Sequence, residues 1–219
     1  MSEIYSPQHR VLQQMFDTSR LADRVVELVV RPTISDDTKA FIESRDMFFL
    51  ASVDHRGYPT CSFKGGVPGF VRVLDPTTLA FPSYNGNGMF LSIGNIDRNH
   101  KVGLLFIDFE TPHRVRLHGV ANIDRNDPLM ADFEGAELIV RVRVTETFIN
   151  CPRYVHRYQR LQTSKYAPQS GYEKPPAPQW KRLDAIQDAL PQGEREVADK
   201  LGGTISFEEY GALVLKGDG

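Results

Sequence analysis

Cysteine is scarce in this 219-residue chain, which has only Cys61 and Cys151. Neither belongs to a Cys-x-x-Cys pair, so a zinc site or a disulfide framework is disfavoured. Long apolar runs are also absent: no stretch approaches the ~18 residues needed to span a bilayer, and the first residues lack the apolar run of a signal peptide. We therefore expect a cytoplasmic protein with free thiols and no membrane partner.

A strong charge of either sign is lacking as well. The 26 Lys and Arg residues nearly balance the 28 Asp and Glu residues, which gives a formal net charge of -2. In the apolar stretches the basic residues alternate with valine and not with exposed aromatic residues, which disfavours nucleic acid as a partner. The chain is long enough to bury a sizeable core.

The usual signatures of catalysis are missing too. There is no Gly-x-Ser-x-Gly elbow, no His-Glu-x-x-His pair, no Walker A loop and no Gly-x-Gly-x-x-Gly between a strand and a helix. Of the six histidines, His113 and His118 are the best spaced for a metal. Being five apart, they would lie on opposite faces of a strand, so we predict neither a metal site nor a catalytic side chain.

Hydrophobic periodicity predicts a mainly β chain with flanking helices. Helical spacing occurs over residues 8–30, as one amphipathic helix or two short ones, and again over 39–45 and 89–97. Six or seven strands with short turns favour an antiparallel barrel over a parallel α/β sheet. The predicted strands form a hairpin over 47–64 and then follow at 70–74, 79–84, 101–109, 113–123 and 136–149.

The last two strands alternate clearly. In 113–123, one face carries Val115, Leu117 and Ala121, and the other carries Arg114, Arg116 and His118. In 136–149, one face carries Leu138, Val140, Val142 and Val144, opposite Ile139, Arg141 and Arg143.

The amino-acid composition changes after residue 150. A basic and aromatic segment comes first, then a Pro-, Gly- and Tyr-rich stretch over 163–180 and predicted short helices over 180–191 and 194–203. The tail over 204–216 fits neither period. We expect three parts: a helical extension over 1–45 that packs on a barrel over 46–160, and a C-terminal loop and helical extension over 161–219.

Two stretches offer a binding site. Thr60, Ser62 and Lys64 are two apart and so share one face of a strand, where they could hold an anion or simply meet solvent. Residues 85–88, Asn-Gly-Asn-Gly, precede a predicted helix and could expose backbone N–H groups to a phosphate, or only make a tight connection. Flavin mononucleotide (FMN) suits such a set of cations and small polar residues, which also includes Ser83, Arg72, Arg114 and Arg116.

The segments FLASVD, PTCSFKGG, LAFPSYNGNGMFLSIGNI, NHKVGLLFID and RVRLHGVA occur in this order. Together they resemble the pyridoxamine 5′-phosphate oxidase-related, FMN-binding split-barrel family over about residues 40–155, and INCPRYVHR is similar to the segment that follows the barrel. The resemblance implies a homodimer of six-stranded antiparallel split barrels with FMN at the subunit interface. It also implies the cofactor contacts: Thr60, Cys61, Ser62 and Lys64 along one strand, Ser83, Asn87, Gly88 and Met89 around the phosphate, and Arg114 and Arg116 from the partner subunit.

The chain departs from the authentic oxidase in two places. Asn87-Gly88-Met89 stands where the oxidase has Ser-Arg-Lys, which shifts phosphate binding toward Lys64, backbone amides and an arginine elsewhere. The C-terminal tail lacks the arginine-rich strand that recognises the substrate's phosphate. The resemblance therefore implies a broader FMN-dependent oxidoreductase with a small-molecule substrate and an electron donor. Alternatives are a non-catalytic FMN- or haem-binding carrier or sensor, a deazaflavin in place of FMN, and a barrel without a cofactor.

Overall fold

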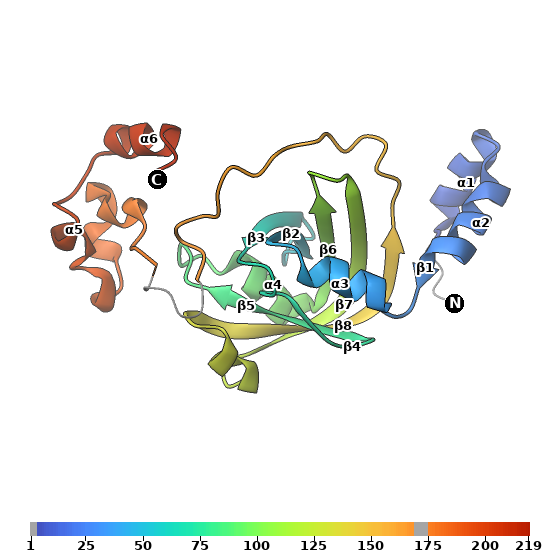
Figure 1. The fold of residues 1–219 in the computed structure, drawn as a ribbon, viewed down its shortest axis with the longest axis horizontal. Coiled ribbons are helices and arrows are strands. Elements are labelled where there is room, and N and C mark those ends of the chain that lie inside the picture. The colour runs from blue at the N-terminus through green and yellow to red at the C-terminus, as the bar shows by residue number, and fades with distance from the viewer. Residues whose placement is uncertain (1–3, 169–174) are drawn as a thin grey trace. The chain divides into compact units, whose positions relative to one another are not determined.

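The computed structural model describes residues 4–168 and 175–219. The chain divides into two compact units, residues 1–162 and residues 163–219. The first unit is a curled antiparallel sheet with flanking helices (Figure 1). Its strands are β1 Val30–Arg31, β2 Met47–Val53, β3 Pro59–Gly65, β4 Arg72–Asp75, β5 Thr78–Tyr84, β6 Lys101–Asp108, β7 His113–Asp124 and β8 Ala136–Ile149. Its helices are α1 Pro7–Met15, α2 Ser19–Val29, α3 Asp36–Glu43, α4 Leu91–Asn99 and the 3-10 helix η1 Pro128–Asp132.

The sheet has the strand order β3-β2-β6-β7-β8-β5-β4, and every pairing in it is antiparallel. β1 adds to β8 through Val30 and Phe148. Because β3 and β4 are the two ends of the order, the curled sheet is a split barrel. This confirms the predicted fold class, although the sheet has eight strands where the sequence pattern predicted six or seven and the resemblance implied six. The two-residue β1 is too short to leave a periodic pattern in the sequence.

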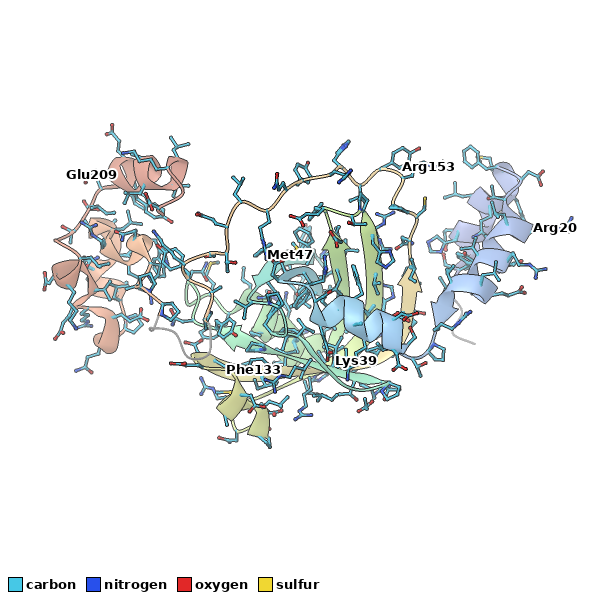
Figure 2. All side chains as sticks on the ribbon, viewed as in Figure 1. Arg20, Lys39, Met47, Phe133, Arg153 and Glu209 are labelled. Atoms are coloured by element: carbon cyan, nitrogen blue, oxygen red, sulfur yellow. The ribbon has the colours of Figure 1, made fainter. Side chains whose placement is uncertain are left out.

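The barrel core is aromatic at its centre. Phe48, Phe81 and Phe106 come from β2, β5 and β6, and each is at most 1% exposed. The ring of Phe48 lies 5.0 Å from each of the other two rings, measured between centroids. Phe133, on the far side of β5, packs with Ala80 and Ile139 in a smaller cluster (Figure 2).

The alternation predicted for the last two strands is confirmed in part. Val115, Leu117 and Ala121 are buried on β7, and the four even-numbered residues from 138 to 144 are buried on β8. The ladder then shifts, because His118 pairs with Glu146 while Gly119 pairs with Val144. Thr145 is therefore an extra residue, a β-bulge, and beyond it the odd-numbered positions face the core.

The N-terminal pattern forms two helices and not one. α1 begins with a capping box in which Ser6 accepts from His9 N–H and the His9 ring accepts from Ser6 N–H. Asp17 adopts a left-handed conformation with φ of 51° between the helices. Neither α1 nor α2 buries a side chain. α3 begins after Ser35, whose side chain accepts a hydrogen bond from the Thr38 N–H and caps the helix.

The second unit contains 3-10 turns where a helix over 180–191 was predicted. They are η2 Gln179–Arg182, η3 Asp184–Ala189 and η4 Gln192–Glu194. The prediction was wrong because Leu183 takes a non-helical conformation and forms a bridge with Ile205. Two helices follow, α5 Val197–Lys200 and α6 Phe207–Leu215. Part of the Pro-, Gly- and Tyr-rich stretch, 169–174, lies outside the described residues.

Over the two described ranges, no helix combines the length and the apolar character needed to cross a bilayer.

Candidate functional site

A cavity of about 230 Å³ lies at the start of α4. It is bounded by the inner face of β3, the end of β5, the glycine-rich loop over 85–88 and the first turn of the helix. The lining residues are Ser62, Lys64, Ser83, Tyr84, Gly86, Asn87, Gly88, Met89, Phe90, Leu91, Ser92 and Ile93. Six of the predicted cofactor contacts are among them.

The polar residues of β3 share one face, as predicted. Pairing with β2 sets Thr60, Ser62 and Lys64 opposite the inward-facing residues Ser52, Leu50 and Phe48. Strand alternation sends Cys61 and Phe63 to the outer face, where both are exposed. Cys61 therefore lies on the other side of the sheet from the cavity.

Lys64 is the cation of the cavity lining. Burial lowers the pKa of its ammonium group below the ordinary value for lysine. Among the residues that the structure describes, no carboxylate forms an ion pair with it. A half-buried cation without a counter-ion is costly, and a bound anion would offset that cost.

The first turn of α4 adds backbone donors to the same cavity. Phe90 is the N-cap and takes the left-handed conformation, with φ of 49° and ψ of 28°, and no side chain caps the helix. The N–H groups of the first turn have no intrahelical acceptor, and the helix dipole makes this end positive. The helix was predicted from Met89 and begins two residues later because the left-handed residue interrupts it.

Four hydroxyl groups complete the polar lining, from Ser62, Ser83, Tyr84 and Ser92. Ser62 and Ser92 share a hydrogen bond of 2.6 Å between their Oγ atoms, and either can be the donor. Burial raises the pKa of Tyr84 to about 12, so its hydroxyl stays protonated near neutral pH. The ladder between β5 and β8 shifts register between Ser83 and Tyr84, and these consecutive residues both line the cavity.

A second polar cluster lies beside the cavity, between α4 and the strands β2 and β3. The amide nitrogen of Asn95 donates to Ser52 Oγ at 3.1 Å and to Thr60 Oγ1 at 3.2 Å. The two hydroxyl oxygens are themselves 2.8 Å apart. Thr60 therefore contacts α4 and is not part of the cavity lining.

The predicted arginines lie away from the cavity. Arg114 donates to the Cys151 carbonyl at 2.8 Å, and its Nε is buried without a hydrogen-bond partner. The guanidinium of Arg116 lies 5.4 Å from the centre of the Phe148 ring. Both arginines project from the outer face of β7. The third candidate, Arg72, forms an ion pair with an aspartate of η1.

The outer face of the sheet also carries a histidine–carboxylate pair. His118 Nδ1 lies 2.6 Å from Glu146 Oε1, and the imidazole packs edge-on against Phe148. The bulge at Thr145 is what turns Glu146 toward this face.

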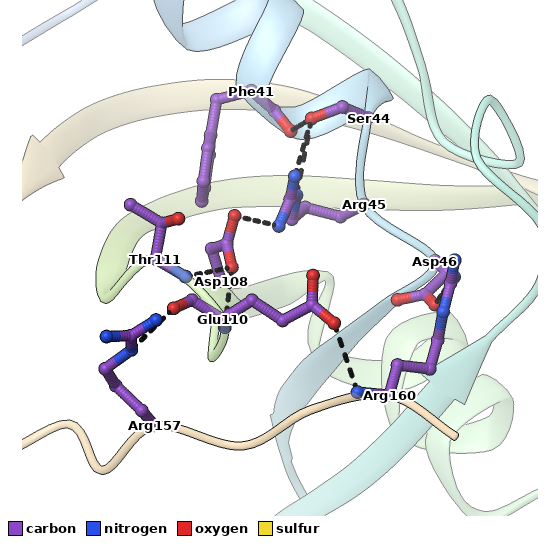
Figure 3. Close-up of polar contacts among 9 residues, drawn as sticks. All are labelled: Phe41, Ser44, Arg45, Asp46, Asp108, Glu110, Thr111, Arg157 and Arg160. Atoms are coloured by element: carbon purple, nitrogen blue, oxygen red, sulfur yellow. Dashed lines mark hydrogen bonds and ion pairs between the residues drawn. The ribbon is translucent and has the colours of Figure 1, made fainter. Parts of the chain in front are cut away.

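The segment after β8 is fastened to the β6–β7 turn (Figure 3). Tyr158 N–H donates to the Phe109 carbonyl at 3.0 Å, and Arg157 Nε donates to the Glu110 carbonyl at 3.0 Å. Arg160 donates its backbone N–H to Glu110 Oε1, and its guanidinium pairs with an aspartate next to β2. By contrast, Arg153 is exposed on the same segment (Figure 2).

On the other side of the same turn, Arg45 pairs with Asp108 at 2.7 Å, and its guanidinium also lies 4.9 Å from the Phe41 ring (Figure 3). The Asp108 side chain also accepts two backbone N–H bonds, from Glu110 and Thr111. These bonds and the arginine outweigh the effect of burial and hold the pKa of Asp108 below its usual range. The turn is therefore braced on both sides.

Sequence reasoning did not single out Tyr84, Ser92 or Asn95. A usable signal was present for Ser92 and Asn95, because both are polar residues within a predicted helix that follows a glycine-rich loop. The spacing of three places them on one face of that helix. No sequence signal marked Tyr84, because its place in the lining depends on the register of β5 against β8.

An open antiparallel barrel with a polar cavity at the start of an inserted helix defines the split-barrel class. A family model described as "Pyridoxamine 5'-phosphate oxidase" matches residues 34–150, which is over half of the 219 residues. The chain belongs to this family. The matched range runs from the start of α3 to the end of β8 and so contains the cavity.

Several solved structures are similar to the chain. A putative pyridoxamine 5'-phosphate oxidase from Lactobacillus delbrueckii is 24% identical over 54% of this chain and 95% of its own, with a TM-score of 0.45. A single-residue variant of HupZ from Group A Streptococcus is 22% identical over 53% and 99%, with a TM-score of 0.44. An FMN-binding protein from Syntrophomonas wolfei is 11% identical over 64% and 97%, with a TM-score of 0.41. The comparison with curated proteins found no match.

Proposed function

We propose that this chain is an FMN-dependent oxidoreductase that binds the phosphate of FMN in the cavity at the start of α4. The observation that carries the proposal is Lys64, a half-buried cation without a carboxylate partner among the described residues, in a cavity also lined by the first turn of α4, which no side chain caps. A phosphate group uses both features, since it accepts several hydrogen bonds and carries negative charge.

The other lining groups suit the same ligand. Of the two hydroxyls in the Ser62–Ser92 pair, one donates to the other, which leaves one O–H group for a phosphate oxygen. Tyr84 supplies another donor that stays protonated. Gly86 and Gly88 place backbone, not side chains, along the rim. The residues present therefore fit a phosphate without the Arg and Lys that the oxidase carries in this loop.

The size of the cavity favours a second subunit. Pockets that hold an entire cofactor or drug-sized ligand usually measure roughly 300–1,000 Å³. A cavity of about 230 Å³ holds the phosphate and the nearest part of the ribityl chain and leaves the ring outside it. We propose that a homodimer covers the ring, which would lie along β3 near the backbone of Thr60 and Cys61, with Arg114 and Arg116 contributed by the partner subunit.

When bound, FMN supplies reversible hydride transfer, and the chain supplies binding and orientation. Lys64 and the α4 N–H groups would hold the phosphate beside the loop over 85–88. In the proposed homodimer, Arg116 of the partner subunit would place a positive charge near the ring, which would favour the reduced form. The substrate is a small molecule, and a reduced nicotinamide is the electron donor we propose to test.

The first test is optical. Protein purified without a tag and gently desalted should absorb as a flavoprotein, and the apoprotein should quench FMN fluorescence on titration. Riboflavin, which lacks the phosphate, should bind at least about tenfold more weakly, since charge-assisted hydrogen bonds contribute about 1.5–3 kcal/mol. Absence of flavin absorbance together with absence of quenching would reject the proposal.

A second measurement distinguishes an enzyme that turns over from a protein that only binds the flavin. Reduced nicotinamide added to the loaded protein should bleach the flavin band if the protein is an oxidoreductase, and leave it unchanged if the protein is a carrier or sensor. Light scattering on the loaded protein measures the subunit count. A monomer would contradict the proposed interface while leaving the phosphate site in place.

A further inference from the structure

We propose that Asn95 is a positioning residue that sets the alignment of β3 against α4 and thereby places Lys64 at the helix N-terminus. The inference rests on the proposed function, because it explains how the phosphate site of that function is assembled. It concerns two cross-links, Asn95 to Thr60 and Ser92 to Ser62, which we call the polar ladder.

The spacing of the polar ladder determines where Lys64 falls. Along β3, the two cross-linked residues are two positions apart, or about 6.7 Å. Along α4 they are three positions apart, or about 4.5 Å of rise, and the two elements run in opposite directions. The next residue on the same face of β3, after Ser62, is Lys64. On α4, the residue before Ser92 is Leu91, the first residue of the helix. The ammonium group therefore extends past the helix side and meets its N-terminal end.

The polar ladder is needed because β3 is an end strand. It pairs with β2 on one side only in the order of the sheet, so the backbone ladder holds one of its two edges. Asn95 binds side chains from both β2 and β3, and Ser52 is only 4% exposed. These partly buried hydrogen bonds join the end strand, its neighbour and the helix, and a buried hydroxyl such as that of Ser52 is costly to leave without a partner.

Loosening the polar ladder should therefore affect the anion more than the rest of the ligand. Displacement of a binding group by about 1 Å is enough to cost much of its contribution. The first-turn N–H groups move with α4, and Lys64 moves with β3, so only ligands that contact both are sensitive to their alignment. FMN contacts both through its phosphate, and riboflavin does not.

The experiment compares Asn95→Ala and Thr60→Val with wild type. Thr60→Val keeps the side-chain volume and removes one partner of Asn95. Thr147→Val is the matched control, because Thr147 is likewise a β-strand threonine whose hydroxyl forms a hydrogen bond, to the Thr33 carbonyl, and it lies outside the cavity lining. Affinities for FMN and riboflavin are measured by fluorescence quenching, and thermal stability is measured for each protein.

We expect the ratio of FMN affinity to riboflavin affinity to fall about tenfold in Asn95→Ala and several-fold in Thr60→Val. Thr147→Val should lose thermal stability and keep the wild-type ratio. If the two ladder variants also keep that ratio, Asn95 has only a structural role and the inference is wrong. If Asn95→Ala does not fold, the isosteric Thr60→Val decides alone.

A flavin-free probe separates this inference from the proposed function. Inorganic phosphate at matched ionic strength should raise the melting temperature of the wild type more than that of Asn95→Ala or Lys64→Met. If wild type binds no flavin but phosphate acts in this way, the proposed function fails and the inference holds. Equal stabilisation of all three proteins, or of none, would overturn the inference.

Discussion

Replacement of Lys64 by methionine is the sharpest test of the phosphate site. Methionine keeps much of the length and the apolar stem of lysine, so the cavity wall stays largely filled while the charge is lost. Because the ammonium group is half-buried and unpaired among the described residues, its contact with phosphate should lie within the usual range for charge-assisted bonds, about 1.5–3 kcal/mol. We therefore expect FMN to bind about 10- to 160-fold more weakly.

Two comparisons isolate the phosphate contact. Riboflavin should bind Lys64→Met with an affinity within about threefold of its affinity for wild type, because riboflavin has no phosphate that could contact the Lys64 ammonium group. Lys101→Met is the control protein, since Lys101 is an exposed lysine at the start of β6 and lies outside the cavity lining. Fluorescence quenching measures all the affinities. An FMN affinity within threefold of wild type, or an equal loss for both ligands, would refute the assigned role.

The pH dependence of FMN affinity tests the same residue without a loss of packing. Burial lowers the pKa of Lys64, so the group loses its proton at a lower pH than an ordinary lysine. FMN affinity should therefore decline as pH rises through that value, and Lys64→Arg, which stays charged, should not show the decline. In the apoprotein the sign is opposite: the unfolded chain binds more protons, so the contribution of Lys64 to folding stability rises with pH between its folded and unfolded pKa values. Parallel pH profiles for wild type and Lys64→Arg would contradict both statements.

Four further substitutions test the fold by urea denaturation and proteolysis. Phe48→Ala should lower the free energy of unfolding by about 3–5 kcal/mol because it empties the aromatic centre of the barrel, and a loss below about 1 kcal/mol would contradict that packing. Gly119→Ala should lower the free energy of unfolding by about 1–3 kcal/mol, since the added Cβ would lie 2.5 Å from a methyl carbon of Val142. As a control, Gly94→Ala in α4, where the added Cβ has open space, should leave the free energy of unfolding unchanged or raise it by up to about 1 kcal/mol. Asp46→Asn removes the ion pair with Arg160 in the segment after β8. It should change the free energy of unfolding by less than about 1 kcal/mol and speed tryptic cleavage within 151–162. An unchanged cleavage rate would show that this ion pair does not hold the segment.

Much of the barrel was predictable because its information is local. Strand alternation, glycine turns and helical spacing predicted the hairpin over 47–64, the inserted helix and the inward faces of β7 and β8. The missed α6 also had a local signal, since Ser206 and Glu209 form a capping box and are three residues apart. The 3-10 turns of the second unit were not predictable in this way, because the bridge between Leu183 and Ile205 that replaces a helix there is a tertiary contact.

In the candidate site, too, the residues with a local sequence pattern were predictable and those that depend on tertiary packing were not. Thr60, Ser62 and Lys64 were recognisable as one face of a strand, and the structure places the last two in the cavity. Tyr84 and Asn95 were not recognisable, since their roles depend on which elements pack together. The roles of Cys61, Arg114 and Arg116 stay predictions, because they depend on a second subunit.

The extra residue at Thr145 has a consequence for how this strand tolerates change in length. Deleting it would restore a regular two-residue alternation through β8, and every side chain after position 144 would then be delivered to the opposite side of the sheet. Thr147, now buried, would point to solvent, and the partners of His118 and Arg116 would turn into the core. One inserted residue thus changes which positions of β8 face the interior. The even-numbered residues do so before the bulge and Thr147 does so after it, which leaves Glu146 and Phe148 on the outer surface.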